Sequence, residues 1–223
     1  EITEQAARYD DIYCEWAPNE KVAMEVAYGA SLAGKRSACV MKHVGVNVAA
    51  DPLFTLSYTG VNAGMVIFAA DDPGMHSSQN EQDSRHYAVS AKLPMLEPAD
   101  SDEARRFTRA AFELSERFDT AVFVKLCTRI SHSQSLVAPQ EPVCPPERPY
   151  VKDIAKYVMV PGNARPRHPI VEARMEALTA FAEETDLNRV ELGADRSFGI
   201  ITSSTCYQYA REVFGPEASI LKL

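Results

Sequence analysis

Short runs of apolar residues alternate along the chain with longer segments in which apolar residues recur every three or four positions. Short runs rich in Val, Ile, Phe and Cys are typical of strands, and the longer spacing is typical of helices. Strands are predicted at residues 12–16, 37–42, 65–70 and 121–126, and helices at 2–9, 20–32 and 101–118. Because strands alternate with helices and the runs are apolar throughout, we expect an α/β fold whose mostly parallel sheet carries helices on both faces.

The pattern changes beyond residue 135. Prolines recur throughout residues 136–167, and proline disfavours both helix interiors and central strands, so this stretch is predicted to be a connector. Helical spacing returns at 168–184. Further apolar runs predict strands at 198–202 and 219–223, with a helix at 207–214 between them. We therefore expect a first domain at 1–135 and the start of a second α/β unit at 168–223. The abrupt ends also suggest a segment cut from a longer protein.

Composition and charge narrow the class of protein. The chain is 46% hydrophobic and 24% charged, which is typical of globular proteins. Its net charge is -8, with no basic stripe, so nucleic acid is not an expected partner. No apolar run approaches the ~20 residues that cross a bilayer, and no signal peptide is visible, so we expect no membrane partner and a cytoplasmic location. Five scattered cysteines predict no metal cluster, and Cys39 and Cys127 are expected to be buried in strands.

Polar residues gather instead where the predicted strands end, at residues 17–21, 42–47 and 71–85. Open α/β sheets bind ligands at the carboxyl ends of their strands. The residue types alone favour a solvated loop at 71–85 and a Glu20 that serves only to complement its helix dipole. The glycine motifs of nucleotide-binding sites and the nucleophile elbow of hydrolases are absent. The histidine spacings typical of metal sites are also absent, so no metal site is predicted.

Five longer strings occur in a fixed order: NEKVAMEVAYGASLAGKR, MKHVGVNVAADPL, DDPGMHSSQNEQDSRHYA, TRISHS and YVMVPGNARPRHP. In these strings the chain resembles the alpha subunits of indolepyruvate:ferredoxin oxidoreductases. That family belongs to the thiamine-diphosphate-dependent 2-oxoacid:ferredoxin oxidoreductases. The resemblance spans nearly the whole chain and implies that residues 1–135 form a pyrimidine-binding domain that lacks its first strand.

The resemblance also implies a site and a reaction. Glu20 would be the catalytic carboxylate that hydrogen-bonds the aminopyrimidine of thiamine diphosphate, and Asn47 would also bind the cofactor. The diphosphate, its Mg²⁺ and the 4Fe-4S clusters would be held outside this chain, which would be inactive alone. The implied enzyme oxidatively decarboxylates indolepyruvate or another arylpyruvate to an acyl-CoA and passes electrons to ferredoxin.

The implied partners are a beta subunit, ferredoxin, coenzyme A, the arylpyruvate substrate and a second copy of the chain. Relatives that act on pyruvate place an arginine after the strand at 65–70, where this chain has Asp71 and Asp72, and two acids cannot grip a carboxylate. The candidates for substrate binding are the cations in these loops, of which the first two rank highest: Lys42, His43, His76 and Arg85. A noncatalytic assembly module is the alternative, and the presence of Glu20 argues against it.

Overall fold

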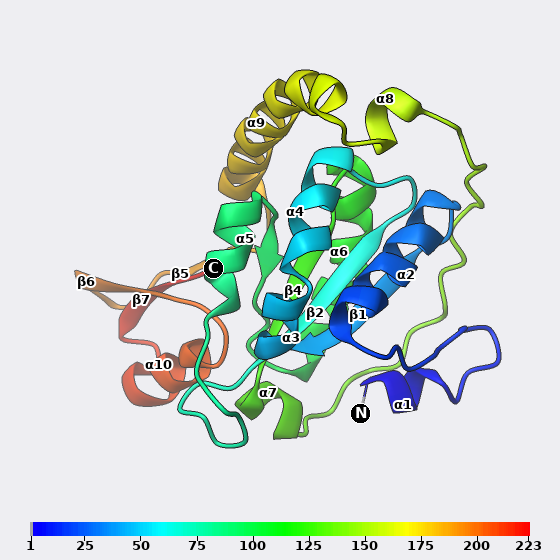
Figure 1. Cartoon of the computed structure of the whole chain (residues 1–223). Coiled ribbons are helices and arrows are strands. Elements are labelled where there is room, and N and C mark those ends of the chain that lie inside the picture. The colour runs from blue at the N-terminus through cyan, green and yellow to red at the C-terminus, as the bar shows by residue number, and fades with distance from the viewer. Residues whose placement is uncertain (1) are drawn as a thin grey trace.

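The computed structural model describes residues 2–223, and a parallel sheet of four strands forms its centre (Figure 1). The strands lie in the order β1-β2-β4-β3. Their bounds are Ser37–Lys42 for β1, Met65–Asp71 for β2, Met95–Leu96 for β3 and Val122–Cys127 for β4. The predicted α/β fold with a mostly parallel sheet is therefore confirmed.

Helices cover both faces of this sheet because alternate residues of its central strands point to opposite sides. Met65, Ile67 and Ala69 pack into a core with helices α2, α3, α4 and α5. Val66 and Phe68 pack on the other side, against α6. The helices are α2 (Glu20–Leu32), α3 (His43–Val48), α4 (Ala50–Thr59), α5 (Ser84–Ala91) and α6 (Ser101–Phe118).

Helices α2 and α6 have the predicted bounds, and both begin at a capping side chain. The Asn19 side chain accepts a hydrogen bond from the backbone of Val22, and the Asp100 side chain accepts one from Glu103. Helices α3, α4 and α5 and the short α7 (Thr128–His132) were not predicted. Only α3 lies mainly in a segment, residues 42–47, whose polar residues indicated a loop.

The strand predicted at residues 12–16 is wrong. After the short helix α1 (Ile2–Ala6), this segment has no regular structure, and the side chains of Tyr13 and Trp16 are 85% and 75% exposed. An apolar run forms a strand only when a neighbouring strand accepts its backbone hydrogen bonds. No such neighbour exists within the described residues.

Residues 136–153 contain neither helix nor strand, and their role as a connector between domains stays a prediction. The expectation that prolines exclude long helices from residues 136–167 is wrong, since α8 spans Ile154–Tyr157 and α9 spans Pro161–Glu184. Helix α9 begins seven residues earlier than predicted. Proline is tolerated in its first turn because backbone N–H groups there make no hydrogen bond within the helix. Pro166 and Pro169 lie farther inside it, where each removes one backbone donor.

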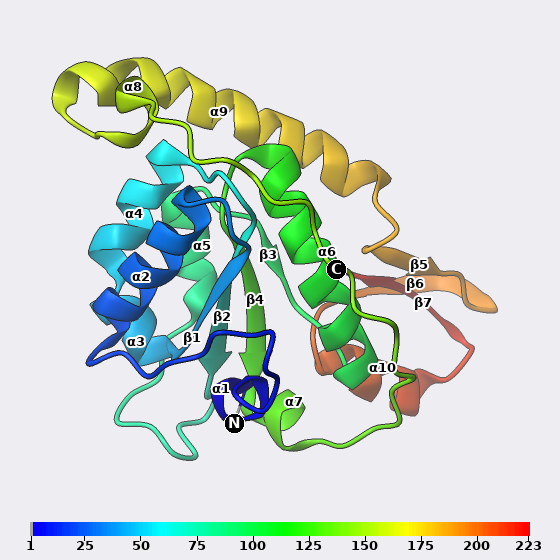
Figure 2. The same ribbon diagram turned by 90° about the vertical axis from the view of Figure 1, so that its right-hand side faces the viewer.

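Contacts with α4 stabilise this proline-containing helix (Figure 2). The buried Arg167 donates to the backbone oxygen of Tyr58 at 2.8 Å. The buried Arg174 donates to the backbone oxygens of Ser57 at 2.6 Å and Asp119 at 2.8 Å. These carbonyls lie at helix ends, where the backbone itself leaves oxygens without partners.

A second sheet of three strands lies beside α6 (Figure 2). It consists of β5 (Arg189–Glu191), β6 (Asp195–Thr202) and β7 (Ala218–Lys222), in the order β5-β7-β6, with α10 (Cys206–Phe214) between β6 and β7. The Lys222 ammonium, fully buried, lies 2.8 Å from the Glu103 carboxylate of α6. The second sheet thus packs directly on the first unit. The division of the chain into two domains stays a prediction.

Cys39 and Cys127 are buried, as predicted. Every helix within residues 2–223 is too short or too polar to cross a membrane.

Candidate functional site

Strands β1, β2 and β4 end side by side at one edge of the first sheet. Lys42 is paired with Ala70, and Ala70 is paired with Leu126, so the segments that follow the three strands start from one row. These segments are α3, the loop at residues 72–83, and α7. Ligands of parallel sheets bind at such an edge, and the predicted site residues on these segments therefore share one region of the molecule.

Glu20 lies at this edge because its helix packs against α3. Its half-buried side chain rests on Gly45, and a Cβ atom at Gly45 would lie only 2.5 Å from Glu20 Cγ and 3.0 Å from Oε1. Only a residue without a side chain allows this approach. The Glu20 carboxylate makes no hydrogen bond or ion pair with any residue in the described part of the chain. It is therefore free to accept a hydrogen bond from a ligand.

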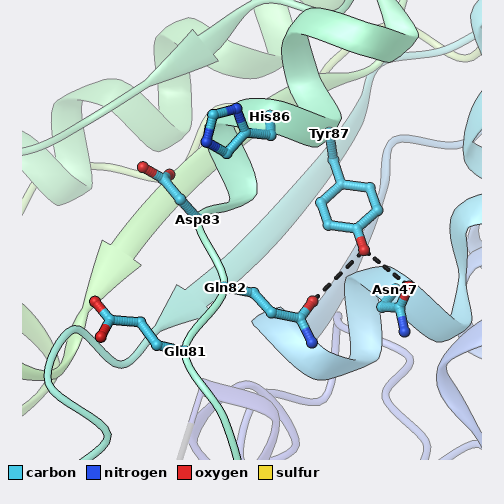
Figure 3. Close-up of a pocket in the computed structure, with 6 residues that line it drawn as sticks. All are labelled: Asn47, Glu81, Gln82, Asp83, His86 and Tyr87. Atoms are coloured by element: carbon cyan, nitrogen blue, oxygen red, sulfur yellow. Dashed lines mark hydrogen bonds between the residues drawn. The ribbon is translucent and has the colours of Figure 1, made fainter.

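Asn47 lines a pocket of about 580 Å³ between α3 and α5 (Figure 3). The Tyr87 hydroxyl lies 2.8 Å from the amide oxygen of Asn47 and 3.5 Å from that of Gln82. Accepting the Tyr87 hydroxyl through its oxygen leaves the Asn47 amino group available as a donor. Sequence reasoning missed Tyr87, although it lies in one of the quoted strings.

The loop at residues 72–83 is not merely a solvated loop, since Asp71 and Asp72 are both buried. The Asp72 carboxylate accepts hydrogen bonds from the Ser78 hydroxyl at 2.6 Å, the Thr128 hydroxyl at 2.7 Å and the Ser77 backbone at 2.8 Å. These donors stabilise the charged form and hold the pKa of Asp72 well below its usual range. Asp72 therefore fixes the loop to the start of α7.

Arg85 is already paired with carboxylates. Its guanidinium donates two hydrogen bonds to Glu97, at 2.6 and 2.7 Å, and one to Asp83 at 3.1 Å. Glu97 also lies 3.6 Å from the buried Lys125, whose ammonium is 3.7 Å from Asp71. This network of alternating charges leaves Arg85 poorly placed to take a further anion.

The other predicted cations differ in exposure. The Lys42 ammonium donates to the backbone oxygen of Ser77, and the buried His43 has its Nε2 atom 3.0 Å from the backbone oxygen of Asn80. Both side chains thus reach the loop at 72–83. His76 is exposed on that loop. The structure gathers Lys42, His43 and His76 at this loop and holds Glu20, the first residue of α2, against α3.

Arg129 was not singled out from the sequence, although it lies in the quoted string TRISHS. It follows β4 on α7 and is exposed, and its side chain has no hydrogen bond, ion pair or ring contact with another described residue. No three His, Cys, Asp or Glu side chains within residues 2–223 lie close enough together to hold a metal ion.

The chain is similar to known proteins over most of its length. No family model matches the sequence. The chain is 44% identical over 222 residues to the indolepyruvate oxidoreductase subunit IorA of Methanothermobacter thermautotrophicus, covering 97% of this chain and 36% of that subunit. It is 43% identical over 206 residues to the Archaeoglobus fulgidus subunit of the same name, covering 91% of this chain and 33% of the relative. The chain thus spans about a third of the length of the curated relatives it matches.

A solved structure agrees on the fold. The 2-oxoglutarate:ferredoxin oxidoreductase from Magnetococcus marinus superposes with a TM-score of 0.69 at 16% identity. The match covers 93% of this chain and 45% of that one. The solved structure supports the fold, and the sequence relatives confirm the resemblance: the chain belongs to the family of the enzyme subunit indolepyruvate oxidoreductase subunit IorA.

Proposed function

We propose that this chain is the pyrimidine-binding part of an oxidoreductase that oxidatively decarboxylates indolepyruvate or another arylpyruvate. The product would be an acyl-CoA, and the electrons would pass to ferredoxin. The partners proposed are a beta subunit, ferredoxin, coenzyme A and a second copy of the chain. The names of the sequence relatives support the substrate class, and the coenzyme A bound in the Magnetococcus marinus structure supports the acyl acceptor.

The Glu20 carboxylate is the observation that carries this proposal. It is half-buried, unpaired within residues 2–223, and held against the backbone of α3. A nitrogen heterocycle that offers a ring N–H needs such an acceptor, and a partly desolvated acceptor binds it more strongly than a solvated one. Asn47 adds an amino group that can donate from the neighbouring pocket. These residues fit the aminopyrimidine of thiamine diphosphate.

Each residue then has a defined task. Glu20 would hold a proton between its carboxylate and the pyrimidine ring nitrogen, and Gly45 would fix the direction in which that carboxylate points. Thiamine diphosphate, when bound, supplies the nucleophilic carbon needed to cleave a 2-oxoacid. Its diphosphate and Mg²⁺, and the 4Fe-4S clusters, would be held by domains outside this chain. The fragment alone would therefore be inactive.

The proposal is tested by replacing Glu20 with Gln in the full parent complex and measuring coenzyme-A-dependent reduction of a viologen dye with indolepyruvate. We expect kcat to fall ~10²-fold or more, the scale of a removed acid-base group. Glu25→Gln is the matched control, because Glu25 is an exposed residue of the same helix. Unchanged turnover in Glu20→Gln would instead support an assembly module.

A further inference from the structure

The cations at the carboxyl edge of the first sheet differ in how far their charges are already neutralised. Arg85 is paired with Glu97 and Asp83, and Lys125 with Asp71 and Glu97. His43 is buried. Arg129 differs from all of these, since its exposed guanidinium has no partner in the part of the chain that the structure describes.

The backbone that carries Arg129 is held firmly. The preceding Thr128 donates its hydroxyl to Asp72 at 2.7 Å, and the following Ile130 is buried in the core beneath α6. The backbone oxygen of Arg129 accepts a hydrogen bond from Ser133 at 3.0 Å. A binding group gains affinity when its support is rigid before the ligand arrives, and Arg129 satisfies this condition.

Arg129 also lies on a segment that starts from the same edge of the sheet as α3, on which Glu20 rests. Lys42 and Leu126 occupy the same row of the sheet, with β2 between them. Gly45, on which Glu20 rests, is three residues beyond Lys42, and Arg129 is three residues beyond Leu126. The ends of β1 and β4 are thus two strand spacings apart, about 10 Å. Arg129 and the segment that supports Glu20 therefore both follow strands that end at this edge.

We infer that Arg129 binds the carboxylate of the 2-oxoacid substrate, an inference that rests on the proposed function. A guanidinium is planar and offers two parallel N–H donors, which match the two oxygens of a carboxylate. The Lys42 ammonium already donates to a backbone oxygen. An imidazole such as that of His76 lacks the two parallel N–H donors of a guanidinium. Arg129 thereby replaces the substrate-binding role expected for Lys42 and His43.

The test uses the full complex and the variants Arg129→Ala and Arg129→Lys. We expect Arg129→Ala to raise KM for indolepyruvate ~10- to 100-fold, the effect of losing hydrogen bonds to a charged group. Arg129→Lys should restore only part of this, because an ammonium cannot bind in the same bidentate way. The Kd of indole-3-propionate, an unreactive carboxylate probe, should rise in parallel, and guanidinium chloride should rescue Arg129→Ala better than sodium chloride at equal ionic strength.

Two comparison variants make the outcome decisive. Arg165→Ala removes another exposed arginine, on α9, and should leave KM and Kd unchanged. Lys42→Ala tests the competing cation. The inference is overturned if Arg129→Ala leaves both constants unchanged, or if Lys42→Ala alone raises them. It fails separately from the proposed function, because Glu20→Gln would still lower kcat ~10²-fold or more in that case.

Discussion

At the scale of single residues, the candidate site depends on a glycine as much as on an acid. Glu20 could be selected from the sequence because its string resembles a known family. The close approach of Glu20 to Gly45 could not be predicted from the sequence, since no local pattern shows that the first turn of α2 packs on α3. Likewise, the burial of His43 and the pairing of Arg85 arise from loop contacts with no local sequence signal.

Gly45→Ala tests the placement of Glu20 without removing it. The added methyl group would overlap the Glu20 side chain, and a flexible side chain moves more easily than a helix, so the carboxylate should shift while the fold persists. We expect kcat in the full complex to fall at least ~10-fold, since misplacing a reacting group by about 1 Å can cost ~10²-fold.

Gly29→Ala is the matched control for that substitution. A Cβ at Gly29 meets nothing within 4 Å, and the residue lies inside helix α2. Alanine there should leave kcat unchanged and stabilise the protein by about 0.5–1 kcal/mol. Equal turnover in Gly45→Ala and Gly29→Ala would contradict the proposed role of Glu20.

At the scale of elements, the sequence predicts structure well where burial and periodicity agree. Strands β1, β2 and β4 and helices α2 and α6 were found within a residue of their predicted ends. The failures have physical causes: residues 12–16 have no strand partner among residues 2–223, and α9 contains prolines that helix propensity alone would exclude. Tertiary contacts, above all those of Arg167 and Arg174 with α4, offset the lost hydrogen bonds.

Arg174→Met should therefore loosen the attachment of α9 to α4. The substitution keeps much of the buried volume but leaves the backbone oxygens of Ser57 and Asp119 without this donor. We expect the free energy of unfolding, measured with urea, to fall by about 2–4 kcal/mol. Arg165→Met, an exposed change on the same helix, should alter it by less than about 0.5 kcal/mol. A similar loss in both variants would rule out a specific contribution of Arg174.

At the scale of the whole molecule, ion pairs connect parts of the chain that are distant in sequence. The Glu116 carboxylate of α6 accepts two hydrogen bonds from Arg36, both 2.9 Å long, and lies 3.3 Å from Arg148 of the connector. The hydrogen bonds from Arg36 lower the pKa of Glu116 below its ordinary value of 4.5, against the opposing effect of burial.

This shift predicts a loss of stability in acid. Because the folded state binds the Glu116 proton more weakly than the unfolded state, the stabilisation is complete above pH 4.5 and declines as the pH falls through the lower folded value. Urea midpoints measured from pH 7 to pH 3 should decrease below pH 4.5, and Glu116→Gln should flatten that decrease. Glu113→Gln, at an exposed neighbouring position, should not. Identical pH profiles for both variants would exclude Glu116 as a cause.

The connector has a consequence for how the protein could be divided. Residues 134–147 are almost all exposed, whereas the backbone oxygen of Arg148 lies directly on Gly34, 1.8 Å from where a Cβ would be, and Asn62 donates to the oxygen of Pro149 at 3.1 Å. A protease that cuts near residue 140 should leave two polypeptides that elute together in gel filtration, and separation of the two would show that the linkage itself holds them. Separately expressed halves should then associate into the folded protein. The molecule would thus behave as a split protein, in which folding depends on the association of its two parts.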